Sequence, residues 1–198
     1  MTIEKPHAPA CDRNRDPILE VLHTHFTDRR HVLEIGSGTG QHAVHFGAAL
    51  PHLQWQTSEC REHHDGIRAW LTEAALTNVL APIALDVAAD AWPARAFDAA
   101  FTANTLHIMS WPEVESMFAG LDGSLRTNAT LVIYGPFNYG GAFTSASNAD
   151  FDQWLKARGT HMGIRDFEAV DALARGIGLR RIADIAMPAN NRCLVWQR

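Results

Sequence analysis

The sequence predicts an α/β fold with a doubly wound, mostly parallel sheet of seven strands that ends in an antiparallel β-pair. Three observations support this prediction. Short apolar segments alternate with helical segments along most of the chain, which is typical of parallel strands joined by crossover helices. A glycine-rich turn directly follows the first predicted strand. Two apolar segments with no helix between them close the chain, which indicates a hairpin.

Length and composition limit the number of domains and the class of partner. The 198 residues suit one domain, expected at residues 12–198 after a flexible N-terminal arm at residues 1–11. Hydrophobic residues make up 46% of the chain and charged residues 20%, which excludes general disorder. The net charge of −5 disfavours phosphate backbones. We therefore expect a small-molecule partner and no nucleic acid.

Cysteine usage and apolar runs predict the compartment. Cys11, Cys60 and Cys193 are odd in number and lack CxxC spacing, which favours reduced thiols in the cytoplasm. The N-terminus lacks an apolar signal segment, and no run reaches the roughly 18 residues of a membrane span. The histidines show no metal-ligand spacing, so no metal is expected. Monomer and homodimer both remain open.

The expected elements follow from apolar spacing. A first helix begins at Asp12 with Pro17 in its first turn, since Ile18, Leu19 and Leu22 recur at helical spacing. Further helices are expected at residues 41–50, 61–76, 112–125, 149–158 and 166–176. Strands are expected at residues 31–35, 53–59, 78–87, 97–108, 129–137, 179–187 and 193–198.

The glycine-rich turn is the strongest chemical signal. Glu34 precedes Gly36-Ser37-Gly38-Thr39-Gly40, in which the glycines recur at every second position. Glycines allow a tight turn and a close backbone approach, and the following helix N-terminus offers free N–H groups. The pattern resembles motif I of class I S-adenosylmethionine-dependent methyltransferases. That resemblance implies a Rossmann-like methyltransferase fold and S-adenosylmethionine binding at Glu34, Gly36, Ser37, Gly38 and Gly40, with S-adenosylhomocysteine as product.

Two further acidic residues end consecutive predicted strands. Glu59 ends the second strand, 19 residues beyond Gly40, where a carboxylate can accept hydrogen bonds from both ribose hydroxyls. Asp86 ends the third strand, where a carboxylate can accept from the adenine amino group while Val87 flanks the ring. A helix cap or a solvated charge explains either acid alone. Three such features at neighbouring strand ends favour a nucleoside cofactor.

The fourth and fifth strands supply the candidate catalytic residues. In class I methyltransferases the segment at Asn104 lies under the methionine part of the cofactor, which makes Asn104 a cofactor-binding candidate. His107 could accept a proton from the acceptor, or it could only hold a loop. Tyr134 leaves the fifth strand toward the same edge of the sheet. A base is needed for a hydroxyl acceptor but not for a thiolate or a neutral amine.

Further segments resemble one small family of methyltransferase-like proteins found in bacteria and animals. The likeness spans residues 12–197 and includes YGPF at 134–137, SNADFD at 147–152 and MPANN at 187–191, together with RNRDP, GTGQH and GIRD. Four residues in or beside these segments are candidate acceptor contacts: Arg15, Phe137, Asn148 and Arg165. Three of them also have a structural interpretation: a surface charge for Arg15, a helix cap for Asn148 and an ion pair for Arg165.

These patterns predict a methyltransferase that acts on a small molecule by in-line displacement. One alternative is a regulatory protein that binds S-adenosylmethionine or S-adenosylhomocysteine without turnover. A nicotinamide-dependent oxidoreductase is disfavoured by the glycine spacing, which differs from GxGxxG. A tRNA methyltransferase is disfavoured because no basic stripe with interleaved aromatic residues occurs. The acceptor, its nucleophilic atom and the use of a general base stay open.

Overall fold

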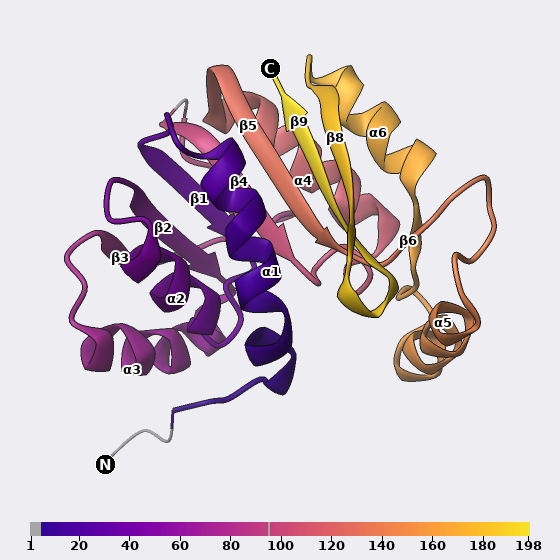
Figure 1. Ribbon diagram of the computed structural model, residues 1–198, viewed down its shortest axis with the longest axis horizontal. Coiled ribbons are helices and arrows are strands. Elements are labelled where there is room, and N and C mark those ends of the chain that lie inside the picture. The colour runs from indigo at the N-terminus through magenta and orange to yellow at the C-terminus, as the bar shows by residue number, and fades with distance from the viewer. Residues whose placement is uncertain (1–4, 95) are drawn as a thin grey trace.

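The computed structural model describes residues 5–94 and 96–198 (Figure 1). The α-helices are α1 (Pro9–His25), α2 (Gln41–Ala49), α3 (His64–Ala74), α4 (Trp111–Ser124), α5 (Ala146–Arg158) and α6 (Phe167–Gly176). Two short 3-10 helices cover Arg61–His63 and Pro188–Asn190. The strands are β1 (His31–Ile35), β2 (Gln54–Glu59), β3 (Val79–Ala84), β4 (Phe97–Ala103), β5 (Leu125–Gly135), β6 (Phe137–Asn138), β7 (Arg165–Asp166), β8 (Arg180–Met187) and β9 (Asn191–Gln197).

The central sheet confirms the predicted fold class. Its seven strands run in the order β3-β2-β1-β4-β5-β9-β8. The pairs from β3 through β5 are parallel, whereas β9 pairs antiparallel with both β5 and β8. The strand order reverses between β1 and β4, so the loops that follow these two strands diverge. A crevice forms at such a point beyond the carboxyl ends of the strands.

Helices cover both faces of the sheet, and each face has its own hydrophobic core (Figure 1). Alternate residues of β1 serve the two faces, because successive side chains of a strand point in opposite directions. Leu33 and Ile35 belong to the core under α4 and α6, whereas Val32 belongs to the core under α1 and α2. The β1 strand is therefore buried on both sides and holds the turn that follows it.

The N-terminal helix begins earlier than the sequence indicated. It starts at Pro9 rather than Asp12, so Pro17 lies inside the helix and not in its first turn. The expectation of a flexible arm is wrong for residues 9–11, which are helical, while residues 1–4 lie outside the described residues. The segment before the helix is bonded to its neighbours, since Trp70 Nε1 donates to the Pro6 carbonyl at 2.7 Å. Apolar periodicity begins only at Ile18, so it could not mark this start.

The amino end of β1 depends on a carboxylate from β4. Asp98 accepts hydrogen bonds from the backbone N–H groups of Arg30 and His31 at 2.8–3.0 Å. We expect Asp98→Ala to lower the free energy of unfolding by about 1–3 kcal/mol, because the exposed Arg30 amide and the part-buried His31 amide lose hydrogen bonds to a charged acceptor. Urea denaturation measures this change. Asp28→Ala is the control, since Asp28 is 76% exposed and, among the residues that the structure describes, pairs only with its neighbour Arg29. Equal effects of the two substitutions would contradict the prediction.

Candidate functional site

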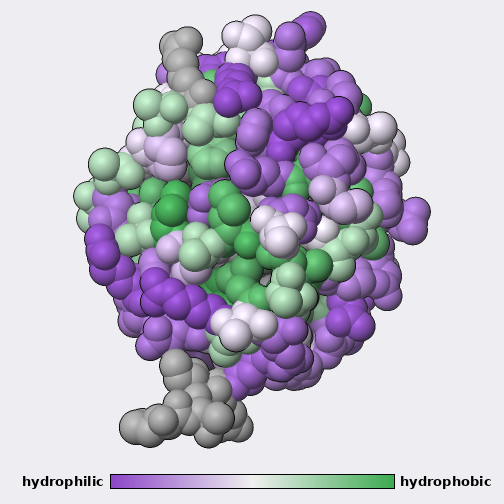
Figure 2. Space-filling view, turned by 90° about the vertical axis from the view of Figure 1, so that its left-hand side faces the viewer, coloured by the Kyte–Doolittle hydropathy of each residue, from purple (hydrophilic) through white to green (hydrophobic). Residues whose placement is uncertain are grey.

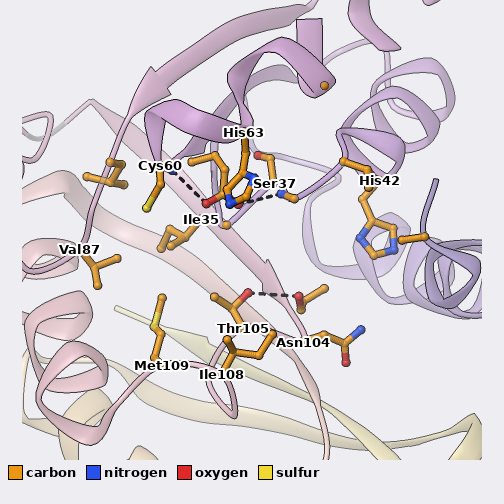
Figure 3. Close-up of a pocket in the computed structure, with 18 of the residues that line it drawn as sticks. Ile35, Ser37, His42, Cys60, His63, Val87, Asn104, Thr105, Ile108 and Met109 are labelled. Atoms are coloured by element: carbon orange, nitrogen blue, oxygen red, sulfur yellow. Dashed lines mark hydrogen bonds between the residues drawn. The ribbon is translucent and has the colours of Figure 1, made fainter. Parts of the chain in front are cut away.

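A cavity of about 1000 Å³ opens at the carboxyl ends of the parallel strands, between the loops that follow β1, β2, β3 and β4. Cavities of this size hold cofactors and small ligands in other proteins. Figure 3 shows Val87 and His42 at opposite ends of the lining residues, with Ser37 and Asn104 between them. Among the predicted cofactor residues, Gly36, Ser37, Gly38, Glu59, Asp86, Val87 and Asn104 line the cavity.

The turn after β1 has the backbone that its glycines allow. Gly36, Gly38 and Gly40 have φ values of 69°, 56° and 91°, in the left-handed region that side chains disfavour. A Cβ on Gly36 would lie 3.0 Å from the Thr105 side chain, so this glycine also permits close contact between two loops. Gly40 does not line the cavity; it is the N-cap of α2 and packs on the backbone of Ile67.

Glu34 supports the glycine turn from below rather than facing the cavity. Its carboxyl oxygen accepts hydrogen bonds from Ser37 Oγ at 2.9 Å and from Trp55 Nε1 at 3.0 Å. Only 2% of Glu34 is exposed. Burial raises the pKa of its carboxyl to about 7. The predicted cofactor contact of Glu34 does not fit this position, because the side chain points into the core toward Trp55.

Glu59 is held by two backbone amides at the end of β2. Its Oε2 accepts from Gly38 N and its Oε1 from Cys60 N, each at 2.9 Å. The carboxylate thus connects the turn after β1 with the turn after β2. Each oxygen retains a free lone pair, and Glu59 lines the cavity. This arrangement presents an oriented carboxylate to a ligand.

Asp86 lies two residues beyond the end of β3 at Ala84, not at the strand end that the sequence indicated. Its Oδ1 accepts from Ala88 N at 3.0 Å, and its own N–H donates to Asp90 at 2.8 Å. This turn brings Asp86 and Val87 to the cavity together. Pro82 on the edge strand does not prevent β3 from forming, because edge strands tolerate a missing N–H donor.

Asn104 follows β4 with a left-handed φ of 59°, an uncommon conformation outside glycine. Its N–H donates to the Tyr134 carbonyl at 2.9 Å. The next residue, Thr105, accepts from Thr102 Oγ1 at 2.7 Å and donates to the Ala103 carbonyl. The sharp turn directs Asn104 and Thr105 into the wall opposite the glycine turn (Figure 3).

Several lining residues had no signal in the sequence. Glu62 and Asp65 come from the turn and helix after β2, and Glu113 comes from the first turn of α4. Hydrogen bonds from Ser110 hold the pKa of Glu113 below its ordinary value. His42, His63 and His161 also reach the cavity. Such residues could not be singled out, because chain distance does not show which helix turns face the strand ends.

The apolar part of the lining includes Ile35, Leu85, Val87, Ile108 and Met109. Ile108 is 49% exposed, which is unusual for a large apolar side chain beside a cavity. Figure 2 shows the face of the molecule that carries β3 and α3, where hydrophobic residues gather around a hollow among hydrophilic ones. A ligand with an apolar or aromatic part would cover such a surface.

The two predicted catalytic residues do not line the cavity. His107 is 6% exposed, lies edge-on to the Phe151 ring, and has a pKa lowered to about 4 by burial and the nearby Arg165 charge. Tyr134 is 4% exposed in the core under α1, where burial raises its pKa and Asn14 hydrogen-bonds to it. Direct catalytic contact by either residue does not fit these positions, because both side chains are buried and neither lines the cavity.

The predicted acceptor contacts also lie outside the lining. Arg165 donates to the backbone carbonyls of Leu106, Met109 and His161, so it anchors the loop after β4. Phe137 is 1% exposed in the core under α4. Neither side chain is free to hold an acceptor. An arginine that binds carbonyls cannot be distinguished in sequence from one that binds a ligand.

Asn148 and Arg15 have structural partners as well. Asn148 donates to Thr144 Oγ1 at 2.9 Å and to the Asn190 carbonyl at 3.1 Å, which ties α5 to the β8–β9 turn. Ser145 is the N-cap of α5, and Asn148 is not. Arg15 is half-buried and forms an ion pair with Asp12 at 3.2 Å. Asn148 and Arg165, from two of the segments that carry the resemblance, thus join the loops around the sheet to one another.

Comparison with known proteins agrees with this architecture. A family model described as "Protein of unknown function (DUF938)" matches residues 5–198. The chain belongs to the DUF938 family. Within the described residues of this DUF938 member, no helix is long and apolar enough to cross a bilayer. The same residues contain no cluster of three or more His, Cys, Asp or Glu side chains placed to hold a metal ion.

Solved methyltransferases share the fold of this DUF938 member. An O-methyltransferase family protein from Burkholderia thailandensis matches with a TM-score of 0.83 and 20% identity over 96% of this chain and 57% of that chain. The mitomycin 7-O-methyltransferase MmcR matches with a TM-score of 0.80 and 18% identity, over 93% of this chain and 54% of that chain. Human N-acetylserotonin methyltransferase, whose structure was solved in complex with S-adenosylmethionine, matches with a TM-score of 0.78 and 12% identity. The match covers 96% of this chain and 52% of that chain. The chain therefore spans just over half the length of these proteins.

The buried carboxyl of Glu34 makes a pH-dependent contribution to stability. Its folded pKa of about 7 lies above the ordinary 4.5, so between these values the folded state keeps a proton that the unfolded chain has lost. Stability from Glu34 is therefore complete below about pH 4.5 and is lost as pH rises through 7. We expect the Glu34→Gln variant not to show this loss. The free energy of unfolding of the variant, relative to that of wild type, should therefore rise by roughly 2–3 kcal/mol between pH 4.5 and 8.

Urea denaturation of both proteins across this pH range measures the difference. The histidines His42 and His107, whose pKa values are lowered to about 4, destabilise the fold as pH falls below 6.5. That contribution is common to both proteins and cancels in the difference. A difference that stays constant with pH would contradict the assignment.

Proposed function

We propose that this protein transfers the methyl group of S-adenosylmethionine to a small-molecule acceptor. The observation that carries the proposal is the convergence of the glycine turn, Glu59 and Asp86 on one cavity at the switch point of the sheet. These groups come from three successive strand ends, and each one has the chemistry that a part of the donor requires. The shared fold with solved methyltransferases supports the same conclusion.

The cavity residues fit the proposed methyl donor. Glu59 would accept from the two ribose hydroxyls, since both its oxygens are oriented by backbone amides. Asp86 would accept from the adenine amino group, and Val87 would cover the ring. Nothing lies within 4 Å of the place where a Cβ of Gly38 would be, so the turn is open for close approach by a ligand. Bound S-adenosylmethionine supplies a methyl group activated by a positively charged sulfur. Alignment of donor and acceptor then provides most of the rate.

The charge of the cavity favours a particular class of acceptor. None of the described lining residues is Lys or Arg. Carboxylates line the cavity at five positions: Glu59, Glu62, Asp65, Asp86 and Glu113. An anionic acceptor would be repelled and would find no cationic partner there. We infer a neutral or cationic small molecule, and the same charges disfavour a nucleic acid. The names of two structural neighbours, which refer to mitomycin and N-acetylserotonin, also support a small acceptor.

The proposed cofactor contacts predict a loss of affinity. We expect Glu59→Ala and Asp86→Ala each to weaken S-adenosylmethionine binding by about 1–3 kcal/mol, the usual loss for hydrogen bonds to a charged group. Isothermal titration calorimetry measures both. Glu20→Ala is the control, since Glu20 is exposed on α1 away from the cavity. Unchanged affinity in both cavity variants would contradict the assignment, and tighter binding of NAD would favour an oxidoreductase.

A labelled donor tests for transfer and for the charge of the acceptor. We expect S-adenosylmethionine with a labelled methyl group to label small molecules in a metabolite extract, and these should be neutral or cationic at pH 7.5. The Glu59→Ala variant should label them more weakly at donor concentrations near the wild-type Kd. Labelled products that are mainly phosphates or polycarboxylates would contradict the acceptor class. Tight binding of S-adenosylhomocysteine without any transfer would favour the alternative of a non-catalytic regulatory protein.

A further inference from the structure

The end of the cavity away from Val87 contains a polar group that the proposed cofactor contacts do not use. His42, the second residue of α2, lies at this end (Figure 3). Its ring stacks on Phe46 with centroids 5.2 Å apart, and it is only 7% exposed. Cys11 of α1 lines the same part of the cavity. His42 belongs to the GTGQH segment of the sequence resemblance, and the proposed cofactor contacts use neither His42 nor Cys11.

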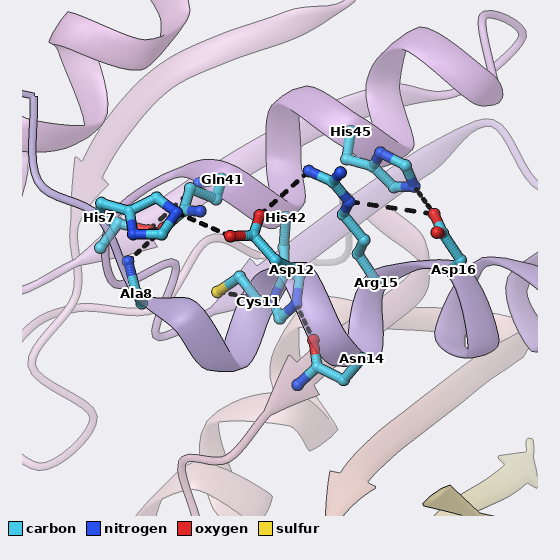
Figure 4. Close-up of polar contacts among 11 residues, drawn as sticks. His7, Ala8, Cys11, Asp12, Asn14, Arg15, Asp16, Gln41, His42 and His45 are labelled. Atoms are coloured by element: carbon cyan, nitrogen blue, oxygen red, sulfur yellow. Dashed lines mark hydrogen bonds and ion pairs between the residues drawn. The ribbon is translucent and has the colours of Figure 1, made fainter.

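A buried hydrogen-bond network determines which ring nitrogen of His42 carries the proton. His42 Nε2 lies 2.7 Å from Asn14 Oδ1 (Figure 4). Asn14 also hydrogen-bonds to the Tyr134 hydroxyl. An amide oxygen only accepts, so Nε2 must donate to it. A neutral imidazole has a single N–H, which leaves Nδ1 unprotonated. Burial lowers the pKa of His42 to about 4, so the ring is neutral at physiological pH.

Within the described residues, the lone pair of His42 Nδ1 has only a weak donor, the Cys11 thiol, which a ligand could replace. Its neighbour is Cys11 Sγ at 4.0 Å, a long contact to a weak donor. Burial raises the pKa of Cys11 to about 11, so the thiol stays protonated. Cysteine and histidine here form no thiolate–imidazolium pair. The cavity instead offers a hydrogen-bond acceptor whose present partner is loosely held.

We propose that His42 accepts, through Nδ1, a hydrogen bond from the O–H, S–H or N–H group that receives the methyl group. Asn14 is the positioning residue that holds His42 in this tautomer, and Tyr134 supports Asn14. The inference rests on the proposed function, because it assigns the adenine to the end of the cavity at Asp86 and the acceptor to the opposite end. It gives Tyr134 an indirect role and transfers the role predicted for His107 to His42.

Charges around His42 favour a neutral donor over the ammonium group of the methionine part. Arg15 lowers the pKa of His42, which means that its charge creates a positive potential at the His42 ring. The same potential would oppose an ammonium group there. It would not oppose the uncharged O–H, S–H or N–H of an acceptor. The carboxylates Glu62, Asp65 and Glu113 approach from other parts of the lining.

The test uses His42→Gln, whose amide can still donate to Asn14 but which lacks an acceptor in place of Nδ1. His45→Gln is the matched control on the same helix, because His45 pairs with Asp16 at 3.0 Å and does not line the cavity. Methyl transfer to the metabolite extract is measured with labelled S-adenosylmethionine. Calorimetry gives the affinities for S-adenosylhomocysteine and for methylthioadenosine, which lacks the amino-acid part. Thermal unfolding verifies that each variant folds.

We expect His42→Gln to reduce transfer at least about tenfold and to change the affinity for S-adenosylhomocysteine less than twofold. His45→Gln should leave both unchanged. Asn14→Asp, which keeps an acceptor for Nε2, should retain more transfer than Asn14→Leu. Unchanged transfer in His42→Gln would overturn the proposal. A tenfold loss of S-adenosylhomocysteine affinity with unchanged methylthioadenosine affinity would overturn it too, because His42 would then bind the methionine ammonium.

Nitrogen-15 spectra of the histidine rings test the premise without any acceptor. They should show His42 neutral and protonated at Nε2, and protonation at Nδ1 would overturn the proposal. The spectra thus distinguish a failure of the proposed function from a failure of the role proposed for His42. Failure of wild type to bind S-adenosylhomocysteine would remove the proposed function, whereas the spectra decide by themselves whether His42 presents an acceptor.

Discussion

The hydrogen bonds that hold the glycine turn after β1 are the constraint on which the rest of the site depends. Glu34 binds Ser37 from inside the core, and Glu59 binds the Gly38 amide from the neighbouring strand. The turn is thus held from below and from one side, while its outer surface stays open. Because Glu34 also binds Trp55 in the core, the shape of the ligand site is coupled to the packing of the sheet.

The opposite wall of the cavity depends on contacts that are distant in sequence. The left-handed turn at Asn104 is bonded to Tyr134 in β5, and the loop that follows is held by Arg165 from β7. A single side chain that binds three carbonyls orders more backbone than an ion pair would. Tyr134 of the YGPF segment and Arg165 of the GIRD segment therefore shape the cavity without lining it. Their separation from the lining is compatible with a function in positioning.

Two histidines with similar electrostatics differ in what they can do. Burial lowers the pKa of both His42 and His107 to about 4, so both rings are neutral. His107 lies against Phe151 and outside the lining, whereas His42 lines the cavity with a tautomer that Asn14 determines. Access and hydrogen-bond partners, rather than basicity, distinguish them. A neutral buried imidazole suits hydrogen bonding to an uncharged group and is a weak base.

The sequence by itself determined the α/β class, the parallel order of the early strands and the glycine turn, because apolar periodicity and glycine spacing depend on neighbouring residues. It also indicated Glu59 and Asp86, since carboxyl ends of parallel strands meet at one edge. Tertiary structure decided that Glu34 lies under the turn, that Arg165 binds carbonyls, and that His42 reaches the cavity. A side chain's partners across the fold depend on helix rotation and loop path, and no local pattern in the chain encodes either.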